Sequence, residues 1–208
     1  MIFGFEGYRF VRSRKARLRR LYDLTSEFYE ELYGGEQEKK FASIISLDPL
    51  KFSKFNVVLD AGCGTGLITK KLLGRGDFIV GVDFSKGMLQ KAKEKLGKAA
   101  EVDFVLGDVE YLPFRSKSFD LVLSITVLQN CCPSRALKSL LRVLSKRGVL
   151  VLSSLKRSRE VEKLEAKLRD HVLKGLDPID NIVILGGQQA TNVNNNREIR
   201  VKPHGVAH

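Results

Sequence analysis

The stretch that decides the fold is Val57-Val58-Leu59-Asp60-Ala61-Gly62-Cys63-Gly64-Thr65-Gly66-Leu67-Ile68-Thr69. Its first three residues predict a short buried strand, and the residues after the last glycine predict a helix. The three glycines between them allow a sharp turn and leave no side chain between the backbone and a ligand. The free N–H groups of the following helix point to the same place. The pattern is typical of a nucleotide-type ligand loop at the first strand of an α/β sheet.

The acid before the loop indicates which ligand is bound. A dinucleotide loop reads G-x-G-x-x-G and places a pyrophosphate at the helix N-terminus. Here the glycines are Gly62, Gly64 and Gly66, and Asp60 precedes the first by two residues. A carboxylate at that position would repel a pyrophosphate but suits an ammonium group. S-adenosylmethionine (SAM) has an ammonium, a sulfonium and a ribose but no phosphate, so we expect SAM as the cofactor.

Apolar runs alternate with helical patterns through the middle of the chain. We predict strands at 57–60, 78–82, 102–106, 119–124 and 149–153, and helices at 66–73, 86–96 and 134–144. Apolar strands separated by helices predict a doubly wound, mostly parallel sheet with helices on both faces. Farther on, we predict a charged helix at 159–173, a strand at 181–185 and a less regular strand at 198–201.

The beginning of the chain predicts a helical extension. Its apolar spacing favours helices at 13–30 and 36–46, with a break at Gly34-Gly35. We therefore divide the chain into an N-terminal basic extension or lid, a SAM-binding domain, and a tail or last edge strand, with boundaries at 1–50, 51–188 and 189–208. The aromatic residues of the extension are interpreted as packing residues rather than ligand contacts: Tyr22, Tyr29 and Tyr33.

The basic charge is concentrated at the N-terminus. The net charge is +12, and residues 1–20 hold seven of the Lys and Arg residues against Glu6 alone. Such a patch can attract nucleic acid or an anionic surface, and the alternative is a solvated basic arm. No apolar run is long enough to span a bilayer, and the three cysteines lack zinc or disulfide spacing. We expect a cytoplasmic protein without membrane insertion and without a metal site.

Acidic residues close the first three predicted strands. In a doubly wound sheet the ligand crevice lies at the carboxyl ends of the strands. Asp60 and Asp83 fall there, and Asp108 follows the third strand. A carboxylate readily accepts hydrogen bonds from two neighbouring hydroxyls, so Asp83 suits the two ribose hydroxyls. Asp108 could accept a hydrogen bond from an adenine amino group. Each acid taken alone could instead cap a turn or helix.

These motifs, in this order, resemble a class I SAM-dependent methyltransferase of the small type 11 branch, over residues 20–155. They comprise Asp60–Gly66, Gly81–Ser85, Gly107-Asp108, Leu112–Phe114, Ser118–Val122 and Leu141–Leu144. The resemblance implies that Asp60 and the glycine loop hold the methionine part of SAM. It also implies that Asp83 binds the ribose and Asp108-Val109 meets the adenine. The expected cofactor site is Asp60, Gly62, Cys63, Gly64, Gly66, Asp83, Phe84, Asp108, Val109 and Ser124.

The chain departs from the family in two places. Ser145-Lys146-Arg147-Gly148 stands where the family often has Pro-Gly-Gly, and the last two strands match poorly. An acceptor should approach the segment 124–133. Enzymes that methylate the amino groups of adenine, cytosine or glutamine usually have an Asn-Pro-Pro-aromatic motif directly after this strand. The segment lacks that motif, which argues against these acceptors. Gln129 and Asn130 are interpreted as helix-capping residues, and Cys131 and Cys132 as packing residues.

We assign no catalytic residue, because methyl transfer from a sulfonium mainly requires alignment, and a base only for an acceptor that must lose a proton early. The favoured acceptor is RNA or a translation component, docked on the basic N-terminal helix. Alternatives are a small-molecule or lipid-like acceptor beneath an N-terminal lid, and a non-catalytic SAM-binding regulatory or partner subunit. Some related enzymes use a small zinc-binding activator protein, which is a further candidate partner.

Overall fold

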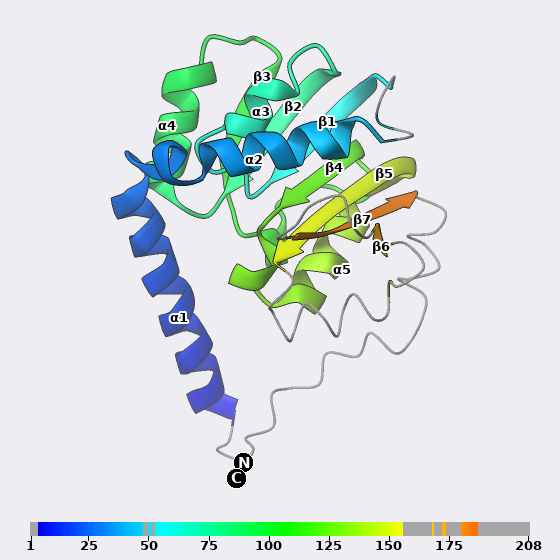
Figure 1. Cartoon of the computed structure of the whole chain (residues 1–208). Helices are drawn as coiled ribbons and strands as arrows, with labels where there is room; N and C mark the ends of the chain where they lie inside the picture. The colour runs from blue at the N-terminus through cyan, green and yellow to red at the C-terminus, as the bar shows by residue number, and fades with distance from the viewer. Residues whose placement is uncertain are drawn as a thin grey trace.

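The computed structural model describes residues 4–47, 50, 53–155, 168, 172–173 and 180–186. These residues form a seven-stranded sheet with the order β3-β2-β1-β4-β5-β7-β6 (Figure 1). The strands are β1 Phe55–Ala61, β2 Gly76–Asp83, β3 Val102–Leu106, β4 Phe119–Ile125, β5 Leu144–Leu155, β6 Val172–Leu173 and β7 Asp180–Gly186. The first five are parallel, and β7 runs antiparallel to both β5 and β6. The predicted doubly wound, mostly parallel sheet is confirmed.

Five α-helices and two short 3₁₀ helices accompany the sheet among the described residues. They are α1 Gly4–Thr25, α2 Tyr29–Ile45, α3 Leu67–Lys71, α4 Lys86–Leu96, α5 Pro133–Val143, η1 Val109–Tyr111 and η2 Leu128–Asn130. Neighbouring strand residues face opposite sides, because side chains alternate along a strand. Val58 accordingly packs in a core with Ile44 of α2, whereas Leu59 packs in the other core with Leu140 of α5.

The predicted helix break at Gly34-Gly35 is wrong. The helix α2 runs through both glycines, and the break lies instead at residues 26–28. Gly34 is buried, and a Cβ there would lie 3.8 Å from Leu67 Cδ2 at the contact between α2 and α3. Tertiary packing thus outweighs the cost of glycine in a helix, about 1 kcal/mol per residue.

The C-terminal part of the chain differs from the predicted pattern where it is described. Val172–Leu173 form the short strand β6, although we predicted the end of a helix there. The strand predicted at 181–185 is confirmed as β7. The strand predicted at 198–201 and the tail 189–208 lie outside the described residues, and the three domain boundaries stay predictions.

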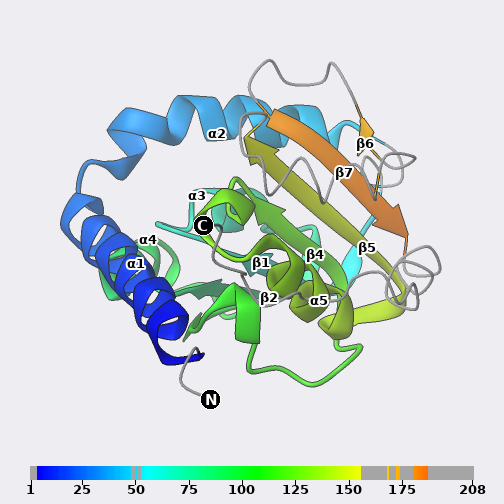
Figure 2. The same ribbon diagram turned by 90° about the horizontal axis from the view of Figure 1, so that it is seen from below.

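The C-terminal end of α1 is hydrogen-bonded to the start of α4. Asp23 Oδ1 accepts hydrogen bonds from Ser85 Oγ at 2.6 Å and from Gly87 N at 3.0 Å. Ser85 also caps α4 by accepting a hydrogen bond from Met88 N at 3.1 Å. From this anchor α1 lies beside α4 and then projects away from the sheet (Figures 1 and 2). Within the described ranges, no helix has both the length and the apolar character needed to cross a membrane.

Candidate functional site

A cavity of about 640 Å³ lies at the carboxyl ends of β1 to β4. This volume includes space that is open to solvent, so the cavity is a cleft rather than a closed chamber. One wall comes from Lys15 and Tyr22 of α1 and Tyr29 of α2. Six of the ten predicted site residues line the cavity: Gly62, Gly64, Asp83, Phe84, Asp108 and Val109. The strand-end position that the sequence indicated is therefore where the structure has its cavity.

The three loop glycines all have positive φ but differ in their surroundings. Gly62, with φ 86°, packs so closely that an added Cβ would lie 2.3 Å from Val127 Cγ2. Gly66, with φ 77°, would bring a Cβ to 3.1 Å from Ala92 Cβ of α4. Gly64, with φ 53°, has no heavy atom within 4 Å of an added Cβ. Gly62 and Gly66 are thus required by packing as well as by φ, whereas Gly64 keeps the cavity floor open.

Asp83 ties the glycine loop to the end of β2. Its Oδ2 accepts from Gly64 N and its Oδ1 from Ser85 N, each at 2.9 Å. Burial raises the pKa of Asp83, although these backbone hydrogen bonds act in the opposite direction. Each carboxylate oxygen can accept more than one hydrogen bond. Asp83 is therefore held rigidly at the cavity and retains capacity for ligand hydroxyls.

Four predicted residues lie outside the cavity lining. Asp60 is 2% exposed, and its Oδ2 accepts from Thr69 Oγ1 at 2.7 Å behind the loop. Burial raises its pKa to about 6. Cys63 and Gly66 pack toward α4, and Ser124 is buried in β4 with no hydrogen-bond partner for its hydroxyl among the described residues. Direct contact between these four residues and a ligand stays a prediction.

Asp108 lies at the far end of the cavity and is engaged by α1. Its Oδ1 accepts from Glu110 N at 3.0 Å, and its Oδ2 accepts from Lys15 Nζ. Lys15 Nζ also lies 2.6 Å from Glu110 Oε1. Burial alone would lower the pKa of Lys15, but the two carboxylates raise it on balance. Sequence reasoning missed Lys15, because only the fold brings it to Asp108.

Two tyrosines contribute rings to the same cavity. The Tyr22 ring lies 6.2 Å from that of Tyr29 and 5.9 Å from that of Phe84, both edge to face. Asn130 Nδ2 donates to the Tyr22 hydroxyl at 2.8 Å, and Asn130 lines the cavity rather than capping α5. Burial raises the pKa of both tyrosines, which keeps their hydroxyls neutral near pH 7. Our interpretation of these tyrosines as packing residues was therefore incomplete.

The loop after β4 holds Thr126 in an unusual conformation. Its φ of 57° is rare for a β-branched residue, and such strain is found at functional sites. Thr126 N donates to Ser153 Oγ at 2.9 Å, and Thr126 Oγ1 accepts from Lys40 Nζ at 2.9 Å. Lys40 is fully buried and pairs with Glu36 at 3.2 Å. Polar side chains of α2 thus fix the loop beside the cavity, which no local sequence signal indicated.

Comparison with known proteins identifies the family. Residues 59–152 match the family model described as Methyltransferase domain, the type 11 branch. An uncharacterized protein of Methanocaldococcus jannaschii is 33% identical over 147 residues, which are 70% of this chain and 55% of that protein. The malonyl-[acyl-carrier protein] O-methyltransferase of Erwinia pyrifoliae is 39% identical over 99 residues, 47% of this chain and 37% of that protein. The chain thus spans about half or less of the length of these relatives.

Solved structures share the fold. The phosphoethanolamine N-methyltransferase 1 of Haemonchus contortus, in complex with phosphoethanolamine and S-adenosylhomocysteine, has a TM-score of 0.63 at 20% identity, over 75% of this chain and 35% of that chain. A Haloferax volcanii complex of the Trm112 methyltransferase activator and a methyltransferase has a TM-score of 0.57 at 20% identity, over 64% and 59% of the chains. Residues 59–152 thus carry a methyltransferase domain of the type 11 branch, and the sheet has the fold of the class I SAM-dependent methyltransferases.

Proposed function

We propose that this chain binds SAM in the cavity beside Asp83 and transfers its methyl group to a small or lipid-like acceptor. The observation that carries the proposal is the pairing of Gly64 with Asp83. Gly64 leaves the cavity floor free of side-chain atoms, and Asp83 presents a fixed carboxylate directly beside it. A ligand with a ribose and a flexible polar chain fits this combination. Asp108, at the other end, suits the adenine amino group.

When bound, SAM supplies an electrophilic methyl group on a good leaving group. The chain's own residues then have to orient the two reactants and exclude water. The neutral rings of Tyr22 and Tyr29 cover the cavity from the side of α1 and α2, and the Thr126 loop forms the opposite rim. The proposal assigns these groups to positioning, and it requires no base for an acceptor that is already deprotonated.

The acceptor end of the cavity favours a small or lipid-like acceptor over RNA. Aromatic and aliphatic side chains line it: Tyr22, Tyr29, Ile125 and Val127. Lys15, the basic residue of α1 that lines the cavity, is already engaged by Asp108 and Glu110. The relatives reported above also give no support to the RNA acceptor that the basic N-terminus suggested. One of them is named for an acyl group on a carrier protein.

Transfer of labelled methyl groups from SAM into fractionated cell extract tests the proposal. We expect the label in small molecules or in material soluble in organic solvent, and unchanged incorporation after RNase treatment. Gly64→Ala, whose Cβ enters the open space of the cavity, is the matched inactive control. Loss of the labelled product after RNase treatment would restore the RNA acceptor. Activity only after addition of a small partner protein would indicate an activator like that of the Haloferax complex.

A further inference from the structure

The side of α1 that faces away from the body carries an exposed row of apolar and basic side chains, continued past the turn into α2. The apolar members are unusually exposed for their size: Leu21 54%, Leu24 69%, Phe28 59% and Leu32 65%. Arg14 and Arg17 precede them and are also exposed. The α1 members recur at intervals of three and four residues, which places them on one side of the helix. We call the row from Arg14 to Leu32 the outer face.

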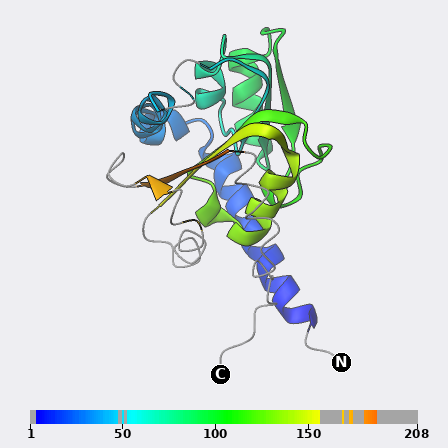
Figure 3. The ribbon, with the colours of Figure 1, turned by 90° about the vertical axis from the view of Figure 1, so that its right-hand side faces the viewer.

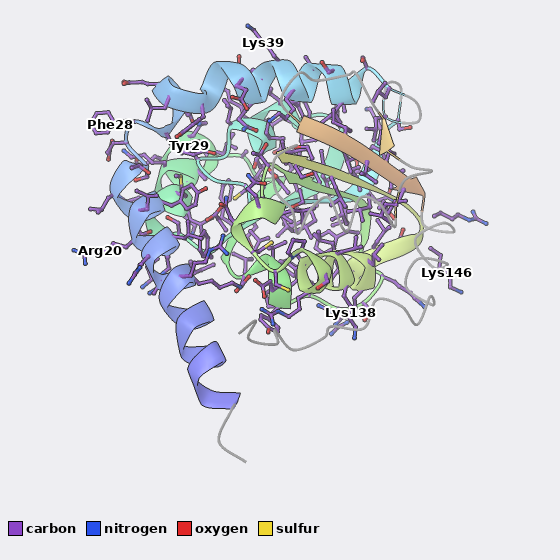
Figure 4. The ribbon with its side chains drawn as sticks, turned by 60° about the horizontal axis from the view of Figure 1, so that its bottom comes forward. Arg20, Phe28, Tyr29, Lys39, Lys138 and Lys146 are labelled. Carbon is purple, nitrogen blue, oxygen red and sulfur yellow. The ribbon has the colours of Figure 1, made fainter. Side chains whose placement is uncertain are left out.

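The outer face takes no part in the cavity or in the described packing of α1. The opposite side of the helix carries Lys15 and Tyr22, which line the cavity, and Asp23, which binds α4. In Figure 4 the labelled side chain of Phe28 points away from the body, whereas that of Tyr29 points toward it. The N-terminal part of α1 projects beyond the body (Figure 3). One helix thus presents one side to the cavity and the other to solvent.

Shape and charge together select the partner. The outer face is a convex ridge, so a protein partner would have to supply a matching groove, whereas a bilayer surface deforms around such a ridge. RNA phosphates would bind the arginines, but exposed leucines contribute little to RNA binding. An anionic lipid surface uses both, because apolar side chains enter the headgroup boundary while Arg contacts the lipid charges. Arg20, also exposed, adds to the attraction, whereas Arg19 interacts with Asp23 on the other side of α1.

We propose that the outer face docks the protein reversibly on an anionic lipid surface. Docking does not depend on methyl transfer, so its test is separate from that of the proposed function. If both hold, docking also brings the cavity wall close to the bilayer, because Tyr22 lies on the opposite side of the same helix from the Leu21–Leu24 pair.

Co-sedimentation with vesicles tests the proposal. We expect the full chain to sediment with phosphatidylcholine–phosphatidylglycerol vesicles, to stay in solution with pure phosphatidylcholine vesicles, and to dissociate as salt is added. Each arginine near an anionic surface contributes about fivefold in affinity, so Arg14→Glu with Arg17→Glu should weaken binding by about 25-fold or more. Leu21→Gln with Leu24→Gln, which keeps helix propensity, should weaken it as well.

The matched control is Lys138→Glu with Lys146→Glu, an identical charge change at exposed positions away from α1 (Figure 4). We expect this variant to keep most vesicle binding, and all variants to keep the circular dichroism of the parent. The proposal is overturned if the control loses binding as strongly as the arginine pair, since attraction would then be a property of net charge alone. It is equally overturned if the leucine variant binds vesicles as tightly as the parent. It is also overturned if the parent does not bind vesicles but forms a dimer that the leucine variant loses, because the outer face would then be a dimer interface.

Discussion

Two glycines of the same loop should fail in different ways when each is replaced by alanine. At Gly64 the added Cβ meets no protein atom within 4 Å, so Gly64→Ala should fold and should intrude on the ligand. At Gly62 the Cβ would lie 2.3 Å from Val127 Cγ2, so Gly62→Ala should damage the fold itself. The pair therefore separates the loop's contribution to packing from its contribution to binding.

The magnitudes follow from backbone conformation and overlap. Both positions have positive φ, which costs an alanine about 1–2 kcal/mol in each case. Gly62→Ala adds overpacking against Val127, about 1–3 kcal/mol more. The free energy of unfolding should thus fall by about 1–2 kcal/mol in Gly64→Ala and by about 2–5 kcal/mol in Gly62→Ala. Adding Val127→Ala to Gly62→Ala should recover part of the overpacking cost, because it removes the clashing atom.

Urea denaturation gives the two stabilities, and calorimetric titration with SAM gives the affinities. We expect Gly64→Ala to bind SAM at least about tenfold more weakly than the parent, a loss of about 1.4 kcal/mol. Normal SAM affinity in Gly64→Ala would refute the placement of the ligand against this loop. Equal stability of the two variants would refute the packing of Gly62 on Val127.

Three further substitutions follow from the same contacts. Asp83→Asn should weaken SAM binding in a calorimetric titration, because both carboxylate oxygens accept backbone N–H groups and an amide NH₂ would oppose one of them; unchanged affinity would count against the ribose role. Since burial raises the pKa of Asp60 to about 6, the folded state favours its protonated form, and the parent should lose about 2 kcal/mol of unfolding free energy relative to Asp60→Asn as pH rises from 4 to 7. Parallel pH profiles from urea denaturation would contradict that burial effect. Asp23→Ala removes two hydrogen bonds to the start of α4 and should expose α1 to limited proteolysis, whereas a digestion pattern like that of the parent would show another anchor.

The fold could be predicted where local chemistry is self-sufficient. The boundaries of α4 and β3 agree with the sequence prediction, because Ser85 caps the helix and Gly97 follows its end. The positions of the acids at the strand ends were also predictable, because parallel strands that alternate with helices place their carboxyl ends along one edge of the sheet. The direction of β7 was not predictable, because no local pattern distinguishes an antiparallel edge strand from a parallel one.

Other parts depend on contacts that no local pattern contains. Gly34 signals a helix end until the packing of α2 on α3 is known. Lys15 belongs to a basic run and becomes a cavity residue only when α1 is placed against Asp108. The left-handed conformation of Thr126 is fixed by Lys40, which precedes it by 86 residues. Tyr22 likewise looks like an ordinary helical aromatic until its ring meets Phe84.

Calorimetric titration of the purified chain with SAM, and separately with the dinucleotide NAD, tests the central claim most directly. Because Asp60 lies directly behind the loop and the glycines are spaced as Gly62-x-Gly64-x-Gly66 rather than as G-x-G-x-x-G, we predict saturable one-to-one binding of SAM and no measurable binding of NAD. Saturable binding of NAD without binding of SAM would contradict the account.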